Sequence, residues 1–163
     1  MGRNNYREHL LVIFEDQAYK DYYLGFANHA LFNDSQIYDG DIFGGWTKIQ
    51  EQVNDENSVT LEHLSRFENA YVLALLDCDK DINRIDNIRR KIPNIYQDRI
   101  FFLSSFDEAE HLKDDLGQGK KETIGYQLAQ HCYDNDSSLW KVPMLNHNLP
   151  EIAKLKIKFK FFS

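Results

Sequence analysis

The chain is poor in cysteine, in proline and in long apolar runs, and each scarcity excludes a class of protein. Cys78 and Cys132 are the only cysteines among 163 residues, too few for a disulfide framework or a cysteine-based zinc site. The first apolar run, Leu10 to Phe14, is too short for a signal peptide, and no other run is long enough to cross a membrane. The composition predicts a single domain, residues 1–163, in a reducing, cytoplasmic setting.

An excess of positive charge is also missing. Lysine and arginine together number 19 against 26 aspartates and glutamates, which gives a formal net charge of −7. Domains that hold nucleic acid by bulk charge are usually basic, so this balance argues against such a surface. It leaves open an enzyme whose acidic residues are masked by metal ions.

What the chain does have is an apolar run that ends in carboxylates. Residues 72–76 are Val-Leu-Ala-Leu-Leu, followed at once by Asp77, Asp79 and Asp81. The run has the length of a buried strand. Like charges this close repel unless a cation lies between them, and Mg²⁺ prefers such oxygen ligands. The alternative is an acidic turn, because aspartate is common in turns and helix caps.

Short apolar runs alternate with amphipathic segments along most of the chain. Strands are expected at residues 10–14, 36–39, 71–76 and 100–103, and helices at 17–31, 46–53, 61–68, 84–92 and 122–133. This alternation predicts an α/β fold with a mostly parallel central sheet flanked by helices. Ligands of such sheets bind beyond the carboxyl ends of the strands. Three acidic groups follow strands there: Glu15-Asp16, the aspartates after residue 76, and Asp107, Glu108 and Glu110 after residue 103.

The tail alternates lysine with apolar residues. Lys154, Lys156, Lys158 and Lys160 are interleaved with Leu155, Ile157, Phe159 and Phe161. Period-two alternation predicts a short C-terminal strand, either an edge strand protected by lysines or a basic strip for phosphates. Another late strand, broken by Pro143, is expected at residues 140–145.

Two of these acidic strand ends resemble the marks of TOPRIM domains, the magnesium-binding α/β domains of topoisomerases, primases and overcoming-lysogenization-defect nucleases. In that family a glutamate ends the first strand and Asp-x-Asp ends the third, where this chain has Glu15 and Asp77-Cys78-Asp79. Gly44-Gly45 falls where many members have a glycine turn, and Asp16 stands where a glycine is usual. The resemblance covers roughly residues 8–115 and points to small free-standing members, which often work beside an ATPase in bacterial defence systems.

The resemblance implies phosphodiester hydrolysis on nucleic acid, DNA in preference to RNA, with Mg²⁺ or Mn²⁺ as cofactor. Asp77 and Asp79 would be metal ligands, and Glu15 a ligand or general base. The candidates for further ligands are Asp81, Asp107 and Glu110, although Asp81 is equally suited to cap the next helix. Lys120 and Lys121 are candidates for a cation that stabilises developing charge.

Two alternatives of other classes remain. One is a non-catalytic interaction or regulatory subunit whose acidic edge is degenerate. The other is a receiver-like phosphoacceptor domain, which would use Glu15-Asp16, Asp77, Ser104 or Ser105, and Lys141. The long separation of Glu15 from Asp77 and the second aspartate, Asp79, are unexplained by a receiver domain.

Overall fold

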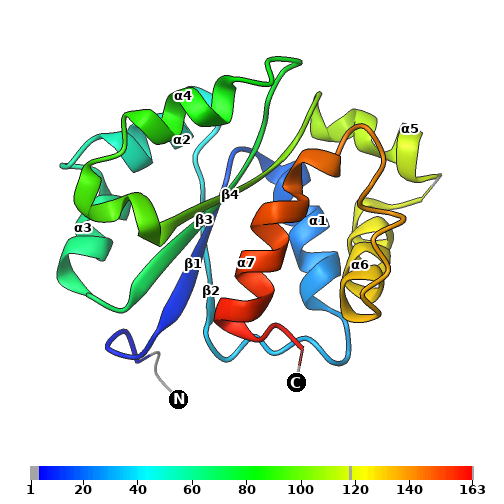
Figure 1. Ribbon diagram of the computed structural model, residues 1–163, viewed down its shortest axis with the longest axis horizontal. Coiled ribbons are helices and arrows are strands. Elements are labelled where there is room, and N and C mark those ends of the chain that lie inside the picture. Colours follow the sequence, from blue (N-terminus) through cyan, green and yellow to red (C-terminus); the bar gives the residue numbers. More distant parts are fainter. Residues whose placement is uncertain (1–3, 118, 163) are drawn as a thin grey trace.

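The computed structural model describes residues 4–117 and 119–162, and a parallel sheet lies at its centre between two layers of helices (Figure 1). The strands are β1 (His9–Phe14), β2 (Ile37–Ile42), β3 (Ala70–Asp77) and β4 (Ile100–Ser105). They pair in parallel in the order β2-β1-β3-β4. The predicted α/β class and parallel central sheet are confirmed.

Each face of the sheet is covered by three main helices, which Figure 1 shows on opposite sides of the strands. One layer contains α1 (Gln17–Ala27), α6 (Lys121–Tyr133) and α7 (Leu149–Phe159). The other contains α2 (Trp46–Asn54), α3 (Val59–Arg66) and α4 (Arg84–Arg90). Shorter pieces are α5 (Leu112–Leu116) and the 3₁₀ turns η1 (Asn94–Arg99), η2 (Ala109–His111) and η3 (Asn146–Asn148).

The apolar character of the central strands follows from burial on both faces. In β3, Leu73 and Leu75 pack toward the layer of α1, whereas Val72, Ala74 and Leu76 pack toward the layer of α2. Because side chains alternate along a strand, a continuous apolar run is what a strand between two cores requires.

The direction in which successive strands are added to the sheet reverses between β1 and β3. The chain places β2 on one side of β1 and β3 on the other, so the helices that follow β1 and β3 cover opposite faces. In open parallel sheets this switch point is where ligands bind, outside the carboxyl ends of the strands. The register pairs Phe14 with Leu75 and Asp77 with Ser105, so Glu15 and Asp77 emerge side by side.

The predicted C-terminal strand is wrong, because residues 149–159 form α7. Leu155 and Phe159, one helical turn apart, are 0% and 1% exposed, while Ile157 is 81% exposed. An alternating pattern also places every fourth residue on one helix face, and packing against β4 and its neighbours selects that arrangement. An isolated bridge between Phe32 and Phe162 is the extended pairing seen in the described part of the tail.

The late strand expected at residues 140–145 is also wrong. This segment forms turns, in which Leu145 N donates to Val142 O at 2.9 Å. Pro143 cannot donate a backbone hydrogen bond, which favours turns over a ladder position. Within the described residues, no helix combines the length and apolarity needed to cross a membrane.

Candidate functional site

Two carboxylates that are distant in sequence meet at the switch point. Glu15 directly follows β1, and Asp77 is the last residue of β3. Asp77 N donates to Glu15 Oε2 at 2.8 Å, and Glu15 N donates to Leu75 O at 2.9 Å. The two residues are only 8% and 9% exposed. The structure therefore brings together the first and third strand ends, as expected from a parallel sheet.

A single arginine faces both aspartates of the Asp77-Cys78-Asp79 segment. Arg84 Nη1 lies 3.3 Å from Asp77 Oδ1, and Nη2 lies 3.8 Å from Asp79 Oδ2. Its guanidinium carbon lies 4.1 Å from the ring centroid of Trp46, and the Arg84 side chain is 10% exposed. Sequence reasoning did not identify Arg84. The sequence feature that could have identified Arg84 is a basic residue at the first position of the helix that follows the acidic end of a strand.

Burial makes ionisation costly for both buried carboxylates. It raises the pKa of Glu15 to about 7, opposed by the hydrogen bond from Asp77 N–H and reinforced by the charges of Asp77 and Asp16. Burial likewise raises the pKa of Asp77 to about 6, although Arg84 acts in the opposite direction. Arg84 is the cation whose charge opposes the rise in pKa at both carboxylates.

Two helices, one from each layer, begin beside this edge. Asp16 caps α1 by accepting from Tyr19 N at 3.2 Å, which accounts for an acid at this position. Gly44 N donates to Glu15 O at 2.8 Å just before α2, and the positive φ of Gly44, 91°, suits glycine. The partial positive charge at helix starts favours carboxylates nearby.

The loop after β4 borders the site. Cys78 N donates to Ser105 O at 2.9 Å, and Lys80 N donates to Phe106 O at 2.7 Å, so the two loops are tied together. Asp107 in this loop pairs with Lys80 at 3.7 Å. The charge of Glu108 contributes to the raised pKa of Asp77. Asp107 and Glu108 therefore border the candidate site.

The remaining candidate residues from the sequence either have other contacts or are exposed. Glu110 pairs with Lys121 at 3.1 Å, and Lys120 immediately precedes α6. Asp81 is exposed, and its Oδ1 accepts from Asn83 N at 3.0 Å, at the turn that leads into α4. Asp79 has a left-handed backbone, φ 46°, and a side chain that is 64% exposed.

Glu15, Asp77 and Asp79 are the carboxylate donors that this edge offers to a metal ion. Within residues 4–117 and 119–162 no group of three or more His, Cys, Asp and Glu is arranged to hold a metal. Mg²⁺, however, keeps several waters and is commonly bound by one or two carboxylates. Glu15 and Asp77 supply two at one edge, with the exposed Asp79 beside them.

A hydroxyl pair lies behind the carboxylates. Tyr19 Oη and Ser105 Oγ are 2.6 Å apart, and Ser105 is the strand partner of Asp77. On the adjacent residue, Ser104 Oγ lies 2.7 Å from His147 Nε2. Both serine hydroxyls are thus held by neighbours. His147 was not predicted from the sequence either, because it lies in a turn that is far from Ser104 along the chain.

Comparison with protein-family models, with curated proteins and with solved structures found no match to this chain.

Proposed function

We propose that the chain is a Mg²⁺- or Mn²⁺-dependent phosphodiester hydrolase of the TOPRIM-like kind. The observation that carries this proposal is the pair Glu15 and Asp77, two buried carboxylates at the ends of adjacent parallel strands. They lie at the switch point of the sheet, with Arg84 as their nearby cation.

In this proposal Glu15 and Asp77 hold the cation, and Asp79 reaches it from the exposed turn. The bound ion would supply an activated water and charge stabilisation for the phosphate. Arg84 keeps Asp77 and Asp79 oriented, and its guanidinium suits contact with a phosphate oxygen. Asp107 and Glu108 border the site and are the candidates for a second ion.

DNA is the proposed substrate, in preference to RNA, and an ATPase is the proposed partner. A formal charge of −7 gives the chain little attraction for a polyanion. A partner that holds the DNA would supply that attraction, in keeping with small TOPRIM-like proteins of defence systems.

The proposal is tested with two aspartate-to-asparagine substitutions, which alter side-chain size and charge equally. Asp77→Asn is expected to lower Mn²⁺-dependent cleavage of plasmid DNA by at least about 100-fold while keeping the fold. Asp86→Asn, on the exposed face of α4, is the matched control and should cleave like the wild type. Circular dichroism verifies folding, and manganese binding is measured by calorimetry. Unchanged cleavage by Asp77→Asn would refute the proposal.

A phosphoacceptor domain is the second candidate, favoured by the strand order. The order β2-β1-β3-β4 is shared with the first strands of receiver-type sheets, and Asp77 ends the third strand with Ser105 beside it. However, Lys141 is an exposed turn residue, and Ser105 Oγ is held by Tyr19. Stoichiometric labelling of Asp77 by a small phosphodonor, lost in Asp77→Asn, would support this candidate. Absence of both labelling and manganese binding would favour a non-catalytic interaction subunit.

A further inference from the structure

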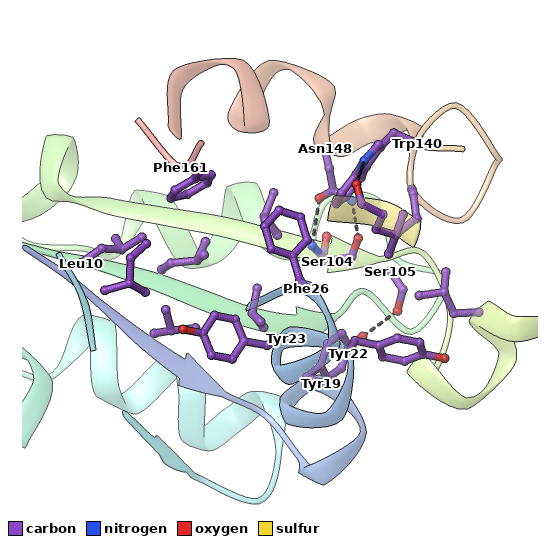
Figure 2. Close-up of a pocket in the computed structure, with 18 of the residues that line it drawn as sticks. Leu10, Tyr19, Tyr22, Tyr23, Phe26, Ser104, Ser105, Trp140, Asn148 and Phe161 are labelled. Carbon is purple, nitrogen blue, oxygen red and sulfur yellow. Dashed lines mark hydrogen bonds between the residues drawn. The ribbon is translucent and has the colours of Figure 1, made fainter. Parts of the chain in front are cut away.

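An apolar cavity lies between the sheet and the layer of α1, α6 and α7, as Figure 2 shows. Its volume is about 110 Å³. Leu10 and Leu75 line it from the strands, Tyr22 and Phe26 from α1, and Leu128 from α6. Natural cores usually have few voids larger than a water molecule, so this space is unusual.

The polar side chains in the described lining are already bonded to the protein. Tyr19 Oη pairs with Ser105 Oγ, and Tyr22 Oη donates to Ala109 O at 2.9 Å. Asn148 bonds to both backbone groups of Ser104, at 2.9 and 2.7 Å, as the dashed lines in Figure 2 show. The remaining polar lining side chains, those of Tyr23, Ser104 and Trp140, also have partners. A water or a polar ligand would therefore find few partners there.

The part of the chain after α6 covers the cavity. Trp140, Leu145, Asn148 and Phe161 all line it from this region. Residues 134–145 form turns instead of a regular helix or strand, and Phe161 O is held by Asn33 N at 2.6 Å.

We propose that this cavity is a binding site for a small, uncharged and wholly apolar molecule, about the size of one benzene ring. A dry apolar cavity of about 150 Å³ in another protein binds benzene or xenon, and this one is slightly smaller. A ligand would restore the dispersion contacts that the lining forfeits around a void. Glu15, Asp77 and Asp79 do not line the cavity, whereas Tyr19 and Ser105, which lie behind these carboxylates, do.

The experiment titrates the full chain with benzene and with phenol, followed by calorimetry and by NMR. Benzene is expected to bind saturably at one site and to raise the unfolding temperature. Phenol should bind at least about tenfold more weakly, because its hydroxyl would be buried without a partner. Intermolecular NOEs from benzene protons to Tyr22 and Leu75 are expected in the wild type.

Two phenylalanine substitutions locate the site. Leu75→Phe fills the cavity and should abolish benzene binding, whereas Leu31→Phe, at a residue that is 42% exposed, should leave it unchanged. If Leu75→Phe does not fold, the wild-type NOEs decide the location. Absence of saturable benzene binding, equal affinity for phenol, or NOEs confined to other residues would overturn the proposal.

Discussion

Two glycines set the distance between α1 and α6. A Cβ added at Gly25 would lie 2.0 Å from Glu122 O, and one added at Gly125 would lie 2.0 Å from Tyr22 O. Each glycine thus faces the backbone of the other helix, which has no flexible end to move aside. These positions are glycines because the two helix backbones touch.

Gly125→Ala is expected to destabilise the protein by about 2–3 kcal/mol, since overpacking outweighs the ~1 kcal/mol gain in helix propensity. The measurement is urea unfolding. Gly119→Ala is the matched control, because the added Cβ would meet Thr123 at an ordinary 3.9 Å. A stabilised Gly125→Ala protein would contradict the close crossing.

The raised pKa values of the buried carboxylates predict a pH effect. A group whose pKa is higher in the folded state contributes stability below its unfolded value and loses it as pH rises through the folded value. Glu15 loses this contribution to stability as the pH rises from about 4.5 to about 7. In buffer with a chelator, Glu15 should make the unfolding free energy of the wild type fall by roughly 3 kcal/mol between pH 5 and 8. Glu15→Gln should remove this fall. An identical pH slope in wild type and variant would contradict it.

At the scale of elements, α7 shows where the sequence pattern is ambiguous. Leu155, Ile157 and Phe159 would share one face of a strand, but the helix separates Ile157 from the other two. The helix is further held where Lys158 pairs with Glu8 at 2.9 Å and where Lys156 donates to Cys132 O at 2.7 Å. Lys156 and Lys158 therefore anchor a helix instead of protecting a sheet edge.

This difference predicts unequal effects for two substitutions. Leu155→Ala should cost about 2–5 kcal/mol of unfolding free energy, whereas Ile157→Ala should change it by less than about 0.5 kcal/mol. Thermal and urea unfolding measure both. Comparable losses at the two positions would favour the strand.

At the scale of the whole molecule, titratable groups occur at both ends of the sheet. Opposite the carboxylates, His9 Nε2 lies 2.8 Å from His63 Nε2, while His9 Nδ1 lies 2.7 Å from Arg7 O. A carbonyl only accepts, so His9 Nδ1–H donates to it, and one of the two Nε2 atoms donates to the other. Burial lowers the pKa of His63, and the neighbouring His9 lowers it further.

The two ends of the sheet predict opposite pH effects on stability in the same acidic range. A histidine whose pKa is lowered by folding contributes stability above its unfolded value of 6.5, and this stability is lost as pH falls. Stability from His63 should therefore be lost as pH falls below 6.5, whereas stability from Glu15 is lost as pH rises from about 4.5 to about 7. His63→Leu is expected to remove the His63 loss of stability on the acid side, below pH 6.5, in a series of thermal unfolding curves. An unchanged acid side in that variant would exclude the imidazole pair as its source.

The sequence by itself determined the sheet and the meeting of its acidic ends. Buried parallel strands require continuous apolar runs, and their carboxyl ends share one edge, so Glu15 and Asp77 were predictable from local pattern. The tertiary structure alone decided the partners of those acids and the state of the tail. Arg84, His147 and the contact of Gly25 with α6 depend on distances between elements that no local pattern encodes. The tail is a helix in which Leu155 and Phe159 are buried while Ile157 is exposed, although its sequence alternates like a strand.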